Sequence, residues 1–379
     1  MSLRGFSLVE LLIALTVSAL VCAAVAGVLP AARAAFDATP GAIDLQQRSR
    51  LSIDVLLAGL RAAGGLGSAL PGGLSLSTAA PVILPLPPAA GSPAAGGFPE
   101  VQLLSPVPGG GRGVLDRDQA GSTGALTLSA ATSCPQADDV CGFRAGAVAV
   151  IVDGYGRYDV FVVAVTSALG SSLVPQSALS AAYKAGSALV EVESSRFGLA
   201  AQPDGSSALV RQSSDGATQP IVDGVSRLGF DVWALADAPT LRPDDTQPWT
   251  SYGPWAPPEG WVEPSGAWAA GESCAVVRDE SGPRTRLSPL GDAGSLVRLT
   301  PSQLQDGPWC PGGPGRPGYD ADAFRLRRVD LTLRVEVLSS VLRGPAGRLF
   351  ARAGAASQSP LRWVPDRTVT LSVATRGAR

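Results

Sequence analysis

Residues 1–29 read MSLRGFSLVELLIALTVSALVCAAVAGVL, and this stretch decides where the rest of the chain can lie. Residues 11–32 carry no charge. A helix that rises about 1.5 Å per residue over that length spans the roughly 30 Å hydrocarbon core of a bilayer. Arg4 lies on the short N-terminal side, which favours leaving that end in the cytoplasm. No second apolar run of this length follows, so we expect one membrane span, with everything after about residue 33 outside the cytoplasmic membrane.

Glu10 is an anomaly, because it places a carboxylate near the start of the apolar segment. A charge costs roughly 2.5–3.5 kcal/mol at the centre of a membrane helix and less near its end, so such residues are usually functional and paired. If the chain were cut before Phe6, the new α-amino group would carry a positive charge one helical turn from Glu10. The same group on a neighbouring subunit could also neutralise the carboxylate.

The run GFSLVELLIAL at residues 5–15 resembles the N-terminal signal of type IV prepilins and type II secretion pseudopilins. In that family a prepilin peptidase cuts after the glycine and methylates the new N-terminal phenylalanine, and the glutamate guides assembly. The resemblance implies that Gly5 is the cleavage position, Phe6 the methylated residue and Glu10 the assembly carboxylate. It also implies three kinds of partner: other pilin or pseudopilin subunits, the prepilin peptidase and an inner-membrane assembly platform.

Two simpler interpretations of the N-terminus stay open. An ordinary signal peptide could be cut near Ala32 to Ala35, where small residues form an A-x-A-like site, but its apolar region seldom carries a glutamate. A plain membrane anchor would retain the chain without any processing. The N-terminus of the mature protein distinguishes the three.

Composition narrows the functional classes. The 379 residues suffice for one sizeable domain or two modest ones beyond an anchor. The net charge is −2, from 30 Lys and Arg against 32 Asp and Glu, so no nucleic-acid partner is expected. Histidine is absent and Lys184 is the one lysine, which removes Ser-His-Asp and Cys-His nucleophiles, histidine metal sites and a Walker-type phosphate loop. We do not expect an enzyme.

Of the five cysteines, Cys22 lies in the apolar run, and the other four lie in Gly-, Pro- and Ser-rich stretches and allow three pairings. The simplest pairing joins Cys134 to Cys141. It leaves Cys274 for Cys310, so that each bond closes a local loop, and an exported domain would let both bonds persist. Four free thiols in a cytosolic protein are the alternative. A zinc site is disfavoured, because the spacings lack the two-residue knuckles that such sites use.

Residues 42–61 predict an amphipathic helix that continues the anchor, with one apolar face formed by Ile53, Leu56, Leu57 and Leu60. Pro30 and Pro40 are expected to kink or interrupt the rod, since each removes a backbone donor and crowds the preceding turn. A glycine cluster at 64–67 is expected to end it.

The remainder of the chain has the pattern of a β protein. Strands are predicted at 82–84, 101–104, 147–152, 158–165, 188–193, 208–212, 228–233, 325–337 and 368–375. Several strands without intervening helices imply an antiparallel sheet. The glycine-rich run 109–113 lacks the strand and helix of a phosphate cradle and is predicted to be a flexible loop. The fold class is therefore α+β and pilin-like: a long N-terminal membrane-spanning helix, then an antiparallel β-sheet domain with long irregular loops.

The predicted organisation has four parts: a leader at 1–5, a transmembrane helix at 6–32, the amphipathic continuation at 33–67 and an exported β-rich domain at 68–379. Within the last part, residues 234–319 form a Pro-, Gly- and Trp-rich insertion that interrupts the strand pattern. Its tryptophans could form an adhesive or glycan-stacking surface. The alternative that we favour is that they pack a segment without regular structure against the sheet.

Acidic pairs occur in turn-like sequence at residues 138–139, 244–245 and 320–322, where Asp commonly makes local hydrogen bonds. No cofactor is expected. Because some pseudopilins bind calcium, Asp320 and Asp322 are kept as weak candidates for a calcium site.

Short segments further along also resemble the larger minor pilins of the PilW-like group and the J-type pseudopilins. They are QQRSR at 46–50 leading into LAGLRAAG at 57–64, FRAG at 143–146, QPIVDGV at 219–225 before LGF at 228–230, and a closing VTL strand at 369–371. This resemblance implies a minor pilin of a type IV pilus, single-pass in the bacterial inner membrane before assembly, with its domain periplasmic or extracellular and a priming or tip position afterwards. A minor pseudopilin of a secretion system and a membrane-tethered binding protein remain the alternatives.

Overall fold

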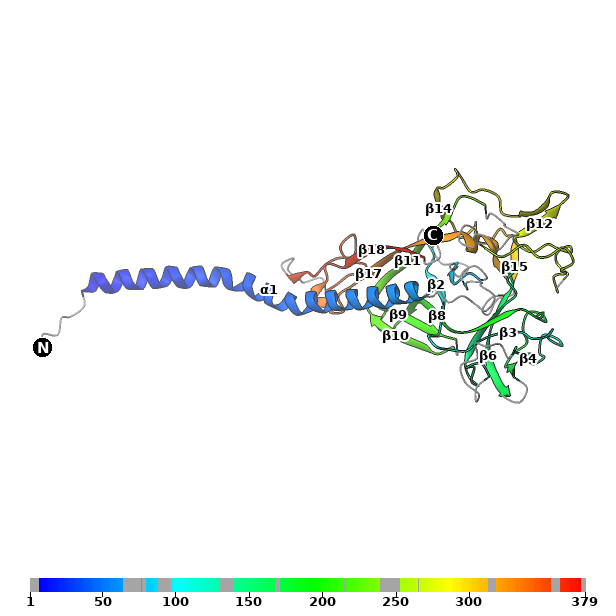
Figure 1. Cartoon of the computed structure of the whole chain (residues 1–379). Coiled ribbons are helices and arrows are strands. Elements are labelled where there is room, and N and C mark those ends of the chain that lie inside the picture. Colours follow the sequence, from blue (N-terminus) through cyan, green and yellow to red (C-terminus); the bar gives the residue numbers. More distant parts are fainter. Residues whose placement is uncertain are drawn as a thin grey trace.

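The computed structural model describes residues 7–63, 76, 80–87, 97–129, 140–167, 171–214, 216–238, 253–264, 266–312, 318–355 and 362–375. One long helix, α1 (Leu8–Ala62), projects from a β-rich domain, and the N-terminus lies at the far end of the helix (Figure 1). We call the described residues from Ala80 to Thr375 the head. The arrangement is α+β with antiparallel sheets, as the sequence predicts.

The helix α1 has 55 residues and begins after the N-cap Ser7. It runs without interruption through Pro30 and Pro40, so neither proline divides the rod. Its C-terminal part packs on the head, where Leu56 is 0 % exposed and Leu60 is 1 % exposed. Two further residues of the predicted apolar face, Ile53 and Leu57, are half-buried against the same core. The predicted amphipathic face is therefore the face that packs.

A polar contact also seats α1 on the head. Arg48 donates from Nη1 to the carbonyl of Asp223 at 2.8 Å, and its Nη2 pairs with Asp44 at 2.8 Å. The next residue, Gly224, has a φ of +71°, and a Cβ there would lie 2.6 Å from Arg48 Nη1. The positive φ therefore favours glycine at this position, and a larger residue would also push Arg48 away from the carbonyl of Asp223.

The larger sheet has ten strands. They are β1 (Ile83–Leu86), β2 (Glu100–Pro106), β3 (Arg112–Val114), β4 (Leu126–Thr127), β5 (Val148–Val152), β6 (Tyr158–Ser167), β7 (Ser172–Pro175), β8 (Ala188–Ala201), β9 (Ser207–Ser213) and β10 (Thr218–Asp223). The main path is β1-β2-β8-β5-β6-β7-β4, with β3 and β9 also pairing with β8 and β10 pairing with β9. The strands predicted at 147–152 and 158–165 correspond to β5 and β6, which pair with each other.

A second sheet has four strands in the order β14 (Leu296–Leu299), β11 (Val225–Leu235), β17 (Leu326–Val335) and β18 (Arg367–Ala374). Two small hairpins join β12 (Val276–Asp279) to β13 (Gly282–Thr285) and β15 (Trp309–Pro311) to β16 (Gly318–Asp320). Short 3-10 helices, η2 (Ala321–Arg325) and η3 (Ser340–Leu342), flank β17. The main hydrophobic core joins α1 to both sheets, and a smaller core lies around Phe143, Phe161 and Tyr183.

Two predictions about irregular segments are wrong. Residues 109–113 were predicted to form a flexible loop, but Arg112 begins β3, which pairs with β8. Residues 234–319 were predicted to lack regular structure, but the described part holds β12 to β15 and the first residues of β16. Both errors concern strands of three or four residues. β3 and β14 pair with strands far away in the sequence, whereas β12 with β13 and β15 with β16 form short local hairpins.

Candidate functional site

The N-terminus of α1 is closed by a reciprocal pair of hydrogen bonds. Val9 N–H donates to Ser7 Oγ at 3.3 Å, and Ser7 N–H donates to Glu10 Oε2 at 3.0 Å. This is a capping box, in which the N-cap hydroxyl and the third-position carboxylate satisfy backbone donors that the helix leaves unpaired. The predicted cleavage residues Gly5 and Phe6 lie outside the described residues.

The predictions above give Glu10 an assembly role only, although Ser7-Leu8-Val9-Glu10 has the S-x-x-E spacing that is typical of a capping box. Glu10 therefore has a partner in its own chain, the backbone N–H of Ser7. That partner is still present in a chain cut before Phe6, because Ser7 then becomes the second residue and keeps its amide. In the capping box one oxygen of the Glu10 carboxylate accepts a hydrogen bond. No described residue supplies a positive charge to balance the carboxylate.

The first half of α1 exposes its apolar side chains. Within the described residues one helical segment, Leu8–Leu29, is long and apolar enough to cross a membrane by length and composition. No part of this segment is buried against the rest of the chain. Leu12 is 55 % exposed and Leu20 is 71 % exposed. Water is a poor environment for such a surface, so a bilayer or other helices must cover it.

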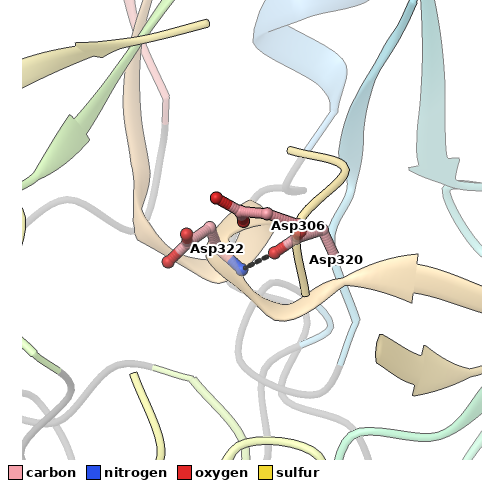
Figure 2. Close-up of side chains that lie close together, drawn as sticks. All are labelled: Asp306, Asp320 and Asp322. Carbon is pink, nitrogen blue, oxygen red and sulfur yellow. Dashed lines mark hydrogen bonds between the residues drawn. The ribbon is translucent and has the colours of Figure 1, made fainter. Parts of the chain in front are cut away.

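A second group of titratable residues lies in the head, where Asp306, Asp320 and Asp322 each bring a carboxylate oxygen within 4.8 Å of the others (Figure 2). Asp320 accepts from the N–H of Asp322 at 2.9 Å and from the N–H of Gly307 at 2.7 Å. Asp322 pairs with Nε of Arg325 at 2.9 Å. Asp306 is exposed. The sequence predicts Asp320 and Asp322 as candidates but not Asp306, which only the fold brings beside them.

Burial controls the charges of this cluster. It raises the pKa of Asp322 to about 6, and the positive charge of Arg325 opposes the shift. Burial also raises the pKa of Asp320, with a smaller contribution from Asp306. Arg325 is itself 0 % exposed and donates to the carbonyl of Ser288 at 2.7 Å, so the ion pair holds η2 in the core. Two of the three carboxylates thus have internal partners, and calcium at this cluster remains a prediction.

Comparison with known families gives one result for this chain. Residues 2–26 match the family model described as the prokaryotic N-terminal methylation motif. This motif supports placing the chain in the type IV pilin and pseudopilin superfamily. No curated protein and no solved structure matches it. The motif implies processing by a prepilin peptidase and pilin partners in general, and it belongs to a structural family rather than an enzyme family.

The residues matched by the motif overlap the start of α1. The match to the family model ends at residue 26, within the exposed apolar segment, and includes Gly5, Phe6 and Glu10. The motif and the exposed helix together support a membrane-anchored protein. Which of the named residues is cut, methylated or used in assembly stays a prediction.

The cysteines divide between described and undescribed positions. A disulfide joins Cys274 to Cys310 across a separation of 36 residues, and the sulfur of Cys274 lies close to Gly156, where a Cβ would be 2.8 Å from it. Cys141 is disulfide-bonded, and its predicted partner Cys134 lies outside the described residues. Cys22 is exposed on α1 as a free thiol.

The tryptophans of the insertion behave in two ways. Trp261 packs on Tyr155 with ring centroids 5.0 Å apart, and Trp268 lies under the guanidinium of Arg286 at 4.2 Å, so these two stabilise the insertion. Trp255 is 39 % exposed and Trp309 is 50 % exposed. The predicted packing role therefore fits Trp261 and Trp268, and it does not extend to the exposed faces of Trp255 and Trp309.

Proposed function

We propose that this chain is a minor pilin of a type IV pilus, cut after Gly5 by the prepilin peptidase and methylated on Phe6. The observation that carries the proposal is the continuity of the methylation motif with a helix whose first half is apolar and exposed. Such a helix can wait in the inner membrane and then leave it for a bundle of similar helices, because both surroundings cover its apolar side chains.

The size and shape of the head favour a priming or tip position. The four-stranded sheet lies on one side of the C-terminal part of α1, and β9 and β10 lie on the other (Figure 1). The two extra hairpins and much of the larger sheet lie beyond the end of the helix and widen the domain further. A domain of this width is difficult to repeat in a tightly packed shaft, whereas one copy at the end of a filament has room. The domain is proposed to be periplasmic before assembly and extracellular afterwards.

The proposed mechanism is assembly, and it needs neither catalysis nor a cofactor. Glu10 is proposed to have two successive partners. In the membrane its carboxylate caps α1 through Ser7 N–H. In the filament its charge is met by the processed amino group of Phe6, from the same chain or from an adjacent subunit.

Mass spectrometry of the mature protein tests the proposal directly. The expected N-terminus is methylated Phe6, and the protein is expected in sheared filaments. An N-terminus at residues 33–36 would contradict the proposal in favour of a signal peptide, and an intact Met1 would favour a plain anchor. A processed protein that is found only with a secretion machine would instead indicate a minor pseudopilin.

A further inference from the structure

The strand β18 forms one edge of the four-stranded sheet. It pairs with β17 over eight consecutive residues, from Arg367 opposite Val335 to Ala374 opposite Arg328, without a register shift. In the described chain it has no neighbour on its other side. A straight edge of this length presents a regular row of backbone donors and acceptors to the surroundings.

The register shows which backbone groups face outward. Thr375 N–H donates to the carbonyl of Arg327, the residue directly opposite, at 2.8 Å. In an antiparallel pair the bonded residues alternate with unbonded ones. The N–H and C=O groups of Thr368, Thr370 and Ser372 therefore point away from β17. The side chains of these three residues are exposed, and no described residue is bonded to their backbone.

Other sheet edges in the same molecule are protected. β1 contains Pro85, which cannot donate to an added strand. β10 contains Pro220 and a register shift beside it. β4 has two residues and β14 has four. By contrast, residues 368–374 of β18 read TVTLSVA, with no charge, proline or glycine. The first three of these residues are all β-branched, which favours an extended strand.

We propose that β18 receives a fifth strand from a neighbouring filament subunit: an uncharged edge strand that runs antiparallel to it. This inference rests on the proposed function, because the occupant is a filament subunit. Backbone hydrogen bonds would supply the affinity, and the neutral Thr, Val and Ser side chains would accept a neutral partner without burying an unpaired charge.

The direction of the chain argues for this occupant. Arg362, shortly before β18, pairs with Asp37 of α1, whereas the C-terminal end of β18 lies over the head (Figure 1). β18 thus runs away from the membrane, as α1 does. The opposite edge, β14, is separated from β18 by three antiparallel pairings and runs the other way.

Helices in one membrane or one filament point in the same direction. A neighbouring subunit with the same kind of sheet therefore presents an edge strand like β14, which runs antiparallel to β18. Two copies that met through their β18 strands would pair in parallel, which is slightly less stable, or would hold their helices in opposite directions. β18 also contacts α1, so a strand added to the outer edge of β18 would extend the sheet that α1 packs against.

Hydrogen exchange on the full-length wild-type protein tests the inference, with an internal control. The outward amides of Thr368, Thr370 and Ser372 should exchange at least about ten-fold more slowly in sheared filaments than in the membrane-retained protein. The inward amides of Val369 and Leu371, already bonded to β17, should not change. Equal exchange of the outward amides in both fractions would overturn the inference. Wild-type protein absent from filaments would contradict the proposed function as well.

A variant removes the outward donor without touching the ladder to β17. Thr370→Pro is tolerable at an edge position whose N–H faces outward, and it should lower filament incorporation at least about five-fold. Thr370→Ala keeps the N–H and should incorporate normally. If Thr370→Pro lowers the melting temperature of the head, Thr370→Lys is used as the edge variant instead. Its matched control is Thr332→Lys, at the opposite position on β17. Normal incorporation of the edge variants would overturn the inference.

A photo-reactive amino acid at Ser372 identifies the occupant. The expected product joins this chain to the edge strand of another protein that has its own cleaved and methylated N-terminus. A product that joins two copies of this chain at β18 would overturn the proposed pairing and replace the occupant with a second copy. Absence of any product in filaments that contain the modified chain would also count against it.

Discussion

The two halves of α1 are parts of one helix with opposite relations to the rest of the molecule. In the second half, Leu56 is 0 % exposed and the side chains of Ser49 and Ser52 are buried. In the first half, Leu12 and Ile13 are 55 % and 57 % exposed. A core residue is stabilised by neighbours that the chain itself supplies. The first half lacks such neighbours among the described residues, so its environment must come from outside the chain: from a membrane and, in the proposed filament, from other subunits.

The largest expected effect concerns Glu10, at the free end of the helix. Glu10→Ala should still be processed, because the residues around the cleavage position are unchanged, and membrane insertion should be unharmed. Filament incorporation should fall about ten-fold or more, since an amino group buried without its counter-charge costs several kcal/mol. The measurement is fractionation of membranes and sheared filaments.

Glu10→Gln is the matched control, because glutamine can keep the capping box but carries no charge. If the charge is what matters, both variants fail to assemble. If Glu10→Gln assembles normally and Glu10→Ala does not, the carboxylate acts as a helix cap and the proposed counter-charge is wrong.

The next effect compares the two halves of α1 directly. Leu56→Ala removes a fully buried side chain and should destabilise the head by about 2–5 kcal/mol. Leu12→Ala should leave the stability of the head unchanged, because Leu12 contacts nothing in it. Denaturant unfolding of the full chain in detergent, followed by tryptophan fluorescence of the head, gives both values. Equal destabilisation by the two variants would show that the halves are not independent.

The smallest effect is a pH response confined to the head. Burial raises the pKa of Asp153 to about 6, above its ordinary value of 3.8. The neutral carboxyl is therefore favoured in the folded state, so its contribution is fully present below about pH 4 and is lost as the pH rises through about 6. Asp153→Asn keeps an acceptor for the N–H groups of Tyr155 and Arg157 and removes the titration.

The stability difference between wild type and Asp153→Asn should therefore change by about 1–3 kcal/mol between pH 4 and pH 7, in favour of the variant at the higher pH. Melting temperatures of the full chain across that range provide the measurement. A difference that is independent of pH would show that Asp153 is ionised throughout the range. The first half of α1 should contribute nothing to this response.

Features with a short sequence range could be predicted well. The apolar span, the packing face of residues 53–60, and the strands β5, β6, β17 and β18 follow from patterns within a few residues of each other. The capping box of Ser7 and Glu10 also has a local signature, although it was not used in the predictions. Local spacing alone decides which side chains share a face, so the sequence is sufficient in these cases.

Tertiary structure decided the features that depend on distant partners. β3 forms in a glycine-rich run because β8 supplies its hydrogen bonds, and Asp306 reaches Asp320 and Asp322 only through the fold around η2. The free edge of β18 is equally a property of strand order, since the same residues would be protected in the middle of a sheet. Sequence by itself determined that this protein has an anchor, a processing motif and a β-rich domain. Only the tertiary structure decided which surfaces that domain leaves unpaired, because pairing between strands depends on contacts that no local pattern specifies.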